Sequence, residues 1–307
     1  MVELSFVIPA YNEEKSIVLL YNKLEQVLKT TRKSYEIIFV DDGSTDSTFD
    51  ELKKIHRTQS KIKIVRFQRN FGKAAALTAG FEEAQGEIIF TMDADLQDDP
   101  EDIPLFLEMV QKGYDLVSGW RVDRKDSIAK RLLSRLYNWL TSMVVGLKLH
   151  DYNCGFKCYK KGLVKSIDVY GELHRYIPAL AYWKGYKIGE VTVKHHKRRF
   201  GKTKYGLGRV FKGFLDLISI KYIYVYNKRP LHFFGLLGLI SFFIGFLASL
   251  YLVVLKFRGE SIGDRPMLML CVLLIVIGVQ FVSLGLLGEM ITRQSRQKEY
   301  IIKEKVV

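Results

Sequence analysis

The sequence is poor in cysteine, with only Cys154, Cys158 and Cys271 among 307 residues. Three thiols cannot form a disulfide framework, and the C-x-x-x-C pair lacks the further ligands of a structural zinc site. We therefore expect all three cysteines to be packing residues in a reducing compartment.

The N-terminus lacks the pattern of a secretory signal. MVELSFVIPAYNEE has no basic segment, carries Glu3 early, and has an apolar core of only five residues. This predicts that the first 230 residues stay in the cytoplasm. A G-x-G-x-x-G turn is also absent, which argues against a dinucleotide-binding dehydrogenase.

Acidic residues are in the minority, with 33 Asp and Glu against 47 Lys and Arg, a formal net charge of +14. Such an excess favours anionic partners such as phosphates or a membrane surface. Nucleic acid is a second candidate, but the sequence has no recognised nucleic-acid-binding motif. We therefore expect no nucleic-acid partner.

Charged residues are absent from two long runs, Leu231–Leu255 and Met267–Gly288. A helix over the first run would be about 37 Å long, against a bilayer core of about 30 Å. The alternative is a pair of buried core helices, but these seldom stay apolar on every face. The pattern predicts a multi-pass protein of the inner (plasma) membrane.

The two runs contain few polar residues apart from His232, Gln280 and scattered Ser and Gly. They therefore offer no ion path of a transporter or channel. Ser241, Gly245 and Ser249 repeat at four-residue spacing, which favours close helix packing and predicts a homo-oligomer, either a dimer or a tetramer.

Short apolar runs alternate with helical patterns over the first 120 residues. The runs at 4–8, 36–40, 62–67, 87–92 and 116–118 predict strands, and the patterns at 13–29, 46–57, 72–84 and 100–112 predict helices. Ser44-Thr45-Asp46 and Asp99-Pro100 are candidate helix N-caps. This alternation predicts an α/β fold with a mostly parallel sheet, whose ligands bind beyond the carboxyl ends of the strands.

Polar clusters follow these predicted strands. Asp93 and Asp95 come after one apolar run, Asp41 and Asp42 after another, and Asn12 after the first. Two carboxylates can hold a divalent cation and leave coordination positions for water and phosphate oxygens. The alternative for each cluster alone is a solvated turn. Their shared edge favours an active site.

Basic amphipathic patterns follow at about 128–147 and 205–226. Each places apolar residues on one face and Lys or Arg elsewhere. Such a helix is either an ordinary surface helix or one lying in a membrane interface. With two predicted spans in the same chain, we favour the interface.

The order and spacing of four motifs carry a resemblance: FVIPAYNEE, VDDGSTD, RNFGKAAAL and MDADLQDDP. Together they resemble the inverting family-two glycosyltransferases, which have a GT-A fold. DYNCGFKCY, the basic RRFGKTKYG and the paired C-terminal runs narrow the resemblance to polyprenyl-phosphate glycosyltransferases. It implies a cytoplasmic GT-A domain at 1–227, two transmembrane helices within 228–290 and a cytoplasmic tail at 291–307.

The resemblance implies a nucleotide site, with a metal ion that is Mg²⁺ or Mn²⁺. Asp95 would be the principal metal ligand with Asp93 beside it, and Gln97 would lie near the diphosphate; Asp98 and Asp99 stay unassigned, and Asp99 also suits a helix cap. The candidates for donor binding are Pro9, Tyr11, Asn12, Glu13, Asp41, Asp42, Lys73 and Asp93.

Five cations are candidates for phosphate contacts: Arg121, Arg131, Arg198, Lys202 and Lys204. The alternative for each is a solvated surface charge. For Arg131, anionic lipid headgroups compete with an acceptor phosphate. The last three, set among glycines, suit a loop that closes on substrate.

The implied reaction transfers one sugar, with inversion, from a nucleotide diphosphate sugar to polyprenyl (undecaprenyl) phosphate. The acceptor is already largely a dianion near neutrality, so a strong base is not required. Asp151 is a candidate base or acceptor-positioning residue; its alternative role is to cap a turn. UDP-glucose is the first choice of donor, and the alternatives are GDP-mannose or a family-two enzyme with a non-lipid acceptor.

Overall fold

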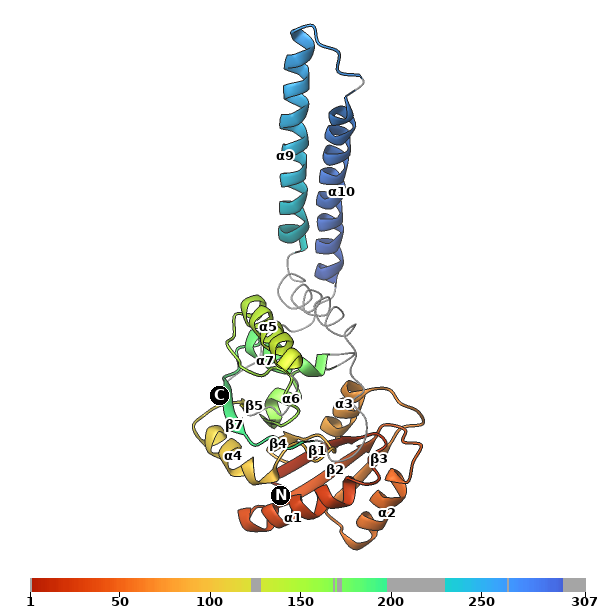
Figure 1. The fold of residues 1–307 in the computed structure, drawn as a ribbon, viewed down its shortest axis with the longest axis vertical. Helices are drawn as coiled ribbons and strands as arrows, with labels where there is room; N and C mark the ends of the chain where they lie inside the picture. Colours follow the sequence, from red (N-terminus) through yellow and green to blue (C-terminus); the bar gives the residue numbers. More distant parts are fainter. Residues whose placement is uncertain are drawn as a thin grey trace. The chain divides into compact units, whose positions relative to one another are not determined.

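The computed structural model describes residues 2–122, 128–167, 169, 173–197, 230–263 and 265–294, without the side chains of 128–133 and 292–294. The chain divides into two compact units, residues 1–217 and 218–307 (Figure 1). The predicted helix at about 205–226, residues 295–307 of the predicted tail, and Arg198, Lys202 and Lys204 lie outside the described residues, as does the side chain of Arg131. Residues 291–294 of the predicted tail are helical.

The first unit contains a seven-stranded sheet in the order β3-β2-β1-β4-β6-β5-β7. Its strands are β1 (Leu4–Ala10), β2 (Tyr35–Asp41), β3 (Ile62–Arg66), β4 (Ile88–Thr91), β5 (Leu116–Arg121), β6 (Lys157–Lys160) and β7 (Ile188–Val193). The pairs β1–β2, β1–β4, β2–β3 and β5–β7 are parallel, while β6 is antiparallel to both of its neighbours. The predicted mixed, mostly parallel sheet is confirmed.

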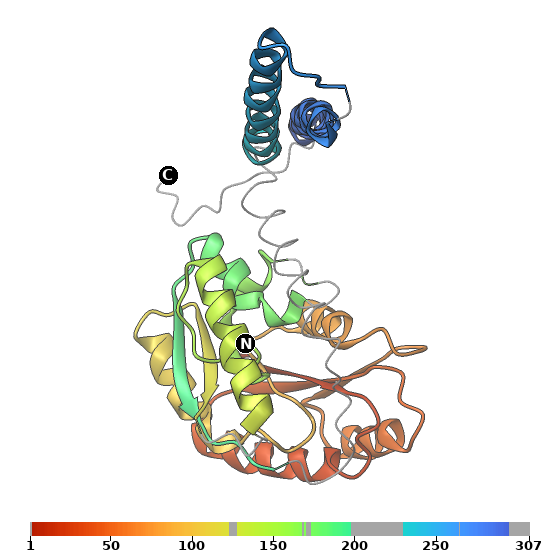
Figure 2. The ribbon, with the colours of Figure 1, turned by 45° about the horizontal axis from the view of Figure 1, so that its top comes forward.

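Helices connect the strands of the first unit. The α-helices are α1 (Ile17–Thr31), α2 (Thr48–Thr58), α3 (Lys73–Glu83), α4 (Ile103–Gln111), α5 (Ile128–Val145), α6 (Lys161–Val164) and α7 (Ile177–Trp183). Two 3₁₀ helices are η1 (Pro100–Asp102) and η2 (Leu173–Arg175). The sheet lies between α1 on one face and α3 on the other (Figures 1 and 2).

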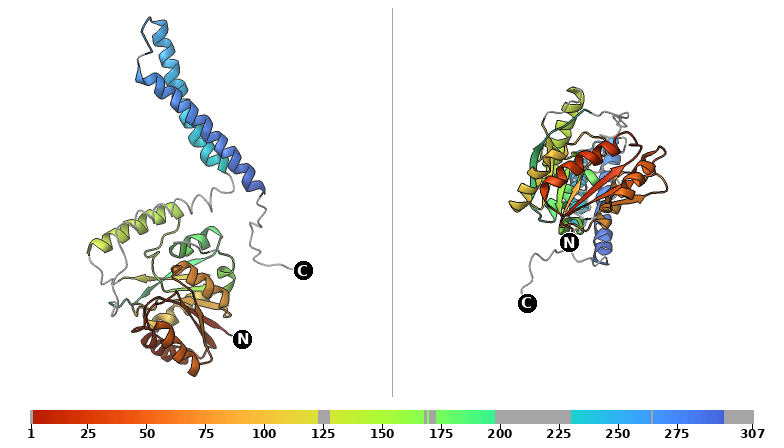
Figure 3. Two further views of the ribbon diagram at one scale, coloured as in Figure 1. Left: turned by 90° about the vertical axis from the view of Figure 1, so that its right-hand side faces the viewer. Right: turned by 90° about the horizontal axis from the view of Figure 1, so that it is seen from below.

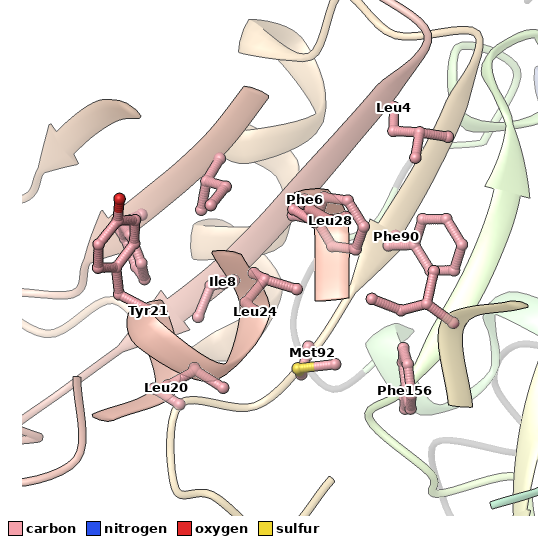
Figure 4. Close-up of a cluster of buried hydrophobic side chains, with 14 of the residues drawn as sticks. Leu4, Phe6, Ile8, Leu20, Tyr21, Leu24, Leu28, Phe90, Met92 and Phe156 are labelled. Carbon is pink, nitrogen blue, oxygen red and sulfur yellow. The ribbon is translucent and has the colours of Figure 1, made fainter. Parts of the chain in front are cut away.

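The core between the sheet and α1 explains why these segments fold together. Leu20, Leu24 and Leu28 recur every four residues, so they share one face of α1 and are buried against β1. Figure 4 shows Leu28 near Phe6 and Leu24 near Ile8, two residues of β1. The Phe6 and Phe90 rings stack with centroids 4.8 Å apart. This burial fixes β1 and β4 side by side, and therefore fixes the loops that follow them.

On the opposite face, α3 approaches the sheet through a glycine. A Cβ on Gly80 would lie 2.2 Å from Val7 Cγ1 and 3.3 Å from Val40 Cγ2. Only a residue without a side chain permits this approach. The close packing sets the position of Lys73, the first residue of α3.

The second unit contains α9 (Pro230–Phe257) and α10 (Pro266–Gln294), which lie side by side (Figure 3). Both are long and apolar enough to cross a membrane, with mean hydropathy of 2.4 and 2.7 over their best windows. A Cβ on Gly238 would lie 2.6 Å from Gly278 O, so the two backbones touch.

The small residues of α9 pack within the chain, which corrects one inference from the sequence. Ser241 Oγ donates to Leu274 O at 2.8 Å, and a Cβ on Gly245 would lie 2.9 Å from Cys271 O. Ser249 Oγ donates within its own helix, to Gly245 O at 2.8 Å. Ser241 and Gly245 therefore serve α10 of the same chain, and they no longer support a homo-oligomer, which stays a prediction without this basis.

The three cysteines are buried and free, as predicted from their spacing. Burial raises the pKa of the Cys154 thiol to about 12, which keeps it protonated and unreactive.

Candidate active site

The loops after β1 and β2 are locked together by hydrogen bonds. Asn12 has a φ of 58°, and its backbone N–H donates to Ser44 Oγ at 3.0 Å. The Asn12 side chain accepts from Thr45 N at 2.9 Å. Glu13 N donates to Thr48 Oγ1 at 2.8 Å. The predicted residues Asn12 and Glu13 thus lie where expected, and they fix the relative position of the two loops.

Pro9 and Tyr11 flank the end of the first strand. Pro9 lies within β1 opposite Val40, and Tyr11 is the first residue after the strand. Both predicted donor-binding residues therefore lie at the expected edge of the sheet.

The two carboxylates at the end of β2 bind protein groups. Asp41 is completely buried, and its Oδ1 accepts from Ser44 N at 3.0 Å. Asp42 accepts from Phe71 N at 2.7 Å and from Gly72 N at 3.0 Å, which anchors the start of α3. For Asp41 the structure favours the alternative interpretation as a turn residue over a contact with the donor.

Asp93 follows β4 and lies among cations. Its Oδ1 forms an ion pair with Lys73 Nζ. Burial raises the pKa of Asp93, but the charges of Lys73, Arg121 and Lys157 hold it below its usual range. A Cβ on Gly155 would lie 2.5 Å from Asp93 Oδ2, so the carboxylate occupies the place of the missing side chain. Asp93 is thus a fixed, ionised group.

Asp95 and Asp98 lie in the loop that follows Asp93, and the charges of Arg121 and Lys73 also reach Asp98. Asp95 is buried, and its Oδ1 accepts from Gln97 N at 3.1 Å across Leu96, whose φ is 61°. Burial, with the carboxylates of Asp93 and Asp95, raises the pKa of Asp98 to about 7. Carboxylates crowded in this way favour a cation between them.

A divalent cation fits this loop when the substrate supplies part of its coordination. Among the described residues, no group of three or more His, Cys, Asp or Glu is arranged to hold a metal. One or two carboxylates with phosphate oxygens and water suffice for Mg²⁺. The ligand roles expected for Asp95 and Asp93 stay predictions, and Asp93 pairs with Lys73 in this structure.

A segment after β7 crosses this acidic loop, a contact that no sequence pattern predicted. His196 N donates to Gln97 O at 2.8 Å, and His196 Nε2 lies 2.7 Å from Asp99 Oδ2. Lys194 N donates to Asp102 Oδ2 at 2.7 Å. Asp99 also accepts from Glu101 N at 3.1 Å, so its predicted role as a helix cap is confirmed.

Arg121 and Asp151 form a buried ion pair. Arg121 Nε lies 2.7 Å from Asp151 Oδ2, and Nη2 lies 3.1 Å from Oδ1. Burial lowers the pKa of Arg121, but the Asp151 carboxylate raises it above its usual value. Asp151 Oδ1 also accepts from Asn153 N at 3.2 Å, which is the turn-capping role foreseen as its alternative. The pair brings together Arg121, a catalytic candidate expected to contact phosphate, and Asp151, the candidate base or acceptor-positioning residue.

Lys157 is a charged residue of this region that the sequence analysis did not select. It lies on β6, is 3% exposed, and its Nζ donates to Cys154 O. Burial lowers the pKa of Lys157 to about 8, and the charge of Lys73 acts in the same direction. The only signal in the sequence was a lysine between two apolar residues, Phe156 and Cys158, both of which are buried.

Acidic and cationic side chains thus gather at the carboxyl ends of parallel strands, the edge at which an α/β sheet binds its ligands. Residues 5–168 match the family described as glycosyl transferase family 2, and the chain belongs to this family.

Two relatives extend the similarity over almost the whole chain. A dodecaprenyl-phosphate galacturonate synthase of Rhizobium johnstonii is 41% identical over 98% of this chain and 92% of its own length. An undecaprenyl-phosphate 4-deoxy-4-formamido-L-arabinose transferase of Yersinia enterocolitica is 36% identical over 95% and 88%. The resemblance to polyprenyl-phosphate glycosyltransferases is thereby confirmed.

Solved structures confirm the GT-A fold of the first unit. The glucosyl-3-phosphoglycerate synthase of Mycobacterium tuberculosis, solved with UDP, superposes with a TM-score of 0.55 at 19% identity, covering 73% of this chain and 80% of its own. The same enzyme solved with Mn²⁺, UDP-glucose and glycerol 3-phosphate gives a TM-score of 0.53 at 18% identity, with the same coverage.

Proposed function

We propose that this protein transfers one sugar, with inversion, from a nucleoside diphosphate sugar to a polyprenyl phosphate. The observation that carries the proposal is the edge of the sheet at the end of β4. There Asp93 is paired with Lys73, while Asp95 and Asp98 lie in a crowded acidic loop. Such an edge suits an anionic diphosphate with its cation, and the near full-length relatives support the lipid phosphate acceptor.

The donor proposed here is a UDP-linked acidic sugar, with galacturonate as the first candidate. Galacturonate is the sugar named for the relative at 41% identity. UDP is supported by the structure of the GT-A neighbour solved with this nucleotide. Galacturonate therefore replaces glucose as the first choice, and GDP-mannose has no support from either relative.

Asp95 would hold the divalent cation, Mg²⁺ or Mn²⁺, together with the diphosphate. When bound, the cation would neutralise negative charge that develops on the leaving diphosphate. The backbone oxygen of Gln97 accepts from His196 N, and this bond would hold the loop in position beside the diphosphate. Asp93 would bind the nucleotide as an ionised, fixed acceptor of hydrogen bonds.

The acceptor phosphate would attack the anomeric carbon while the nucleoside diphosphate leaves. Its second pKa of about 6 makes it largely a dianion, so no protein base has to remove a proton. Both oxygens of Asp151 already accept hydrogen bonds, from Arg121 and Asn153. Asp151 therefore acts as a positioning residue that holds the Arg121 cation near the site.

The membrane association proposed from the sequence gains support from α5. This helix buries the polar Asn138 and Thr141, while Leu136, Trp139 and Met143 are 52%, 59% and 58% exposed. The arrangement is the reverse of a soluble surface helix and suits an interfacial helix. With α9 and α10 crossing the bilayer, the catalytic unit would face the cytoplasm at the plasma membrane, next to its lipid acceptor.

The test is transfer of label from radiolabelled UDP-galacturonate, UDP-glucose, UDP-galactose and GDP-mannose into organic-extractable lipid. Purified full-length protein receives undecaprenyl phosphate and Mn²⁺ or Mg²⁺, with EDTA as a parallel arm. We expect EDTA to abolish transfer and Asp95→Ala to reduce it by about 10²-fold or more. Asp50→Ala, which removes an exposed carboxylate of α2, is the matched control and should retain activity.

Two outcomes would overturn the proposal. Equal activity of Asp95→Ala and Asp50→Ala would remove the acidic loop from the chemistry. UDP binding without labelled lipid from any donor would show a non-lipid acceptor, the second alternative drawn from the sequence.

A further inference from the structure

Lys157 is a buried ammonium group that forms no ion pair with a carboxylate of the described residues. It is 3% exposed, and its Nζ donates to one carbonyl oxygen, that of Cys154. Within the described part of the chain it takes part in no ion pair. An ammonium group carries three N–H donors, and its burial without an anion costs free energy.

Two neighbouring cations, Lys73 and Arg121, act on Lys157, and both are paired with carboxylates. Lys73 pairs with Asp93, and Arg121 pairs bidentately with Asp151. Lys73 and Arg121 each lower the pKa of Lys157, so they act on it as like charges. Asp151 acts in the opposite direction, but Lys157 is the cation of this cluster that pairs directly with no carboxylate of the described residues.

The cluster is open on the side of Asp93. The side chains of Lys73 and Asp93 are 30% and 37% exposed, whereas Lys157 forms the buried floor. Lys157 is also one of the three cations that lower the pKa of Asp93. Gly155, two residues before Lys157, contacts the Asp93 carboxylate. An anion that entered beside Asp93 would therefore approach Lys157.

We propose that Lys157 determines the donor sugar by supplying the positive charge that receives a sugar carboxylate, with Lys73 at the rim. This inference rests on the proposed function. A hexuronate would neutralise the buried ammonium group, whereas a neutral hexose would leave it without an ion pair. Sites built around a polar partner discriminate strongly against analogues that lack it.

If Lys157 had a purely structural role, the effect of replacing it on activity would be different. Its hydrogen bond to Cys154 O holds the connection that leads into β6. If that bond were its whole function, replacing Lys157 would lower activity with every donor by the same factor.

The experiment compares kcat/KM for UDP-galacturonate and UDP-galactose, two donors that differ at C6, where one has a carboxylate and the other a hydroxymethyl group. The variants are Lys157→Gln, which removes the charge but retains a donor for Cys154 O, and Lys157→Arg, which restores the charge. Lys160→Met is the matched control, because Lys160 lies on the same strand and pairs with Asp115 at 2.9 Å.

We expect the wild type to prefer UDP-galacturonate by about 100-fold or more, and Lys157→Gln to reduce this ratio to within about tenfold of unity. Lys157→Arg should recover part of the preference, and Lys160→Met should keep it in full. An equal loss with both donors, or a wild type that uses both equally, would overturn the inference.

Calorimetric binding of the same two donors makes the result independent of the acceptor. If no lipid is labelled but the wild type binds UDP-galacturonate more tightly than UDP-galactose, and Lys157→Gln loses this preference, the inference stands while the proposed acceptor fails. Equal binding of the two donors by the folded wild type contradicts it. Thermal unfolding of each variant establishes that the proteins compared are folded.

Discussion

Glu36 is a buried carboxylate that joins three segments of the first unit. It accepts from Ser5 Oγ at 2.6 Å and from Gln85 N at 2.7 Å, and it lies 2.8 Å from Lys63 Nζ. Burial raises the pKa of Glu36, but these partners hold it below its usual value of 4.5. The side chain therefore stabilises the fold in its ionised form.

Replacing Glu36 by glutamine should lower the free energy of unfolding at pH 7 by about 1–3 kcal/mol, because it weakens three interactions of a buried group. A lowered folded pKa gives stability that is fully present above the unfolded value near 4.5 and is lost as the pH falls through the folded value. The wild type should thus lose more stability on acidification than Glu36→Gln. Denaturant unfolding at pH 7 and pH 4 checks this, and parallel pH profiles of the two proteins would contradict it.

Single residues were predictable where a strand end marks them. Asp93, Asp95, Asn12 and Glu13 follow strands whose periodicity is clear, so their shared edge followed from the parallel sheet. Lys157 was missed, because nothing local in a sequence shows that a lysine at the start of a strand is buried without an ion pair among the described residues.

In the second unit, α9 and α10 contact each other closely through two glycines. A Cβ on Gly278 would lie 2.8 Å from Gly238 O and from the Phe242 backbone N. Two facing glycines therefore allow the helices to touch without side chains between them.

Gly278→Leu should separate the two helices and destabilise the pair by about 1–3 kcal/mol, the usual cost of overpacking. Val279→Leu is the matched control, since Val279 is 53% exposed on the same helix and tolerates an added methylene. The readout is thermal unfolding of the full-length protein in detergent. Equal transition temperatures for the two variants would show that the Gly238–Gly278 contact does not hold the pair.

Elements were predictable from periodicity, but their ends were not. The strand predicted at 87–92 is β4 at Ile88–Thr91, and the helix predicted at 13–29 begins at Ile17. The residues before Ile17 form turns, because their backbone groups bond across to the loop after β2. Such tertiary bonds override the local pattern at the ends of elements that border the candidate site.

At the scale of the whole molecule, the sheet order was beyond the sequence. Apolar periodicity identifies strands but not their partners, and the antiparallel β6 enters between β4 and β5 through pairs such as Thr91–Lys157. This long-range insertion brings Lys157 and Gly155 to Asp93. The positions of Asp93 and Asp95 were therefore predictable from the sequence, whereas the position of Lys157 beneath them was not.

The two apolar helices predict how the full-length protein behaves in isolated membranes. It should stay in the membrane pellet after alkaline carbonate, because buried apolar surface rather than charge would hold it. Washing with about 1 M salt, which screens the attraction of a +14 chain to anionic lipid, should release little protein. Release by salt or carbonate, detected by immunoblot of the supernatant, would show a peripheral protein and contradict spanning helices.

The insertion of β6 also imposes an order on folding during synthesis. β4 gains its second neighbour only when Lys157–Lys160 has emerged, and both partners of β5 lie later in the chain. Until then a nascent chain presents the unpaired edge of β4, a template for association with other chains. Ribosomal pausing within residues 92–156 would prolong this exposure, so the yield of folded protein depends on how quickly that stretch is translated.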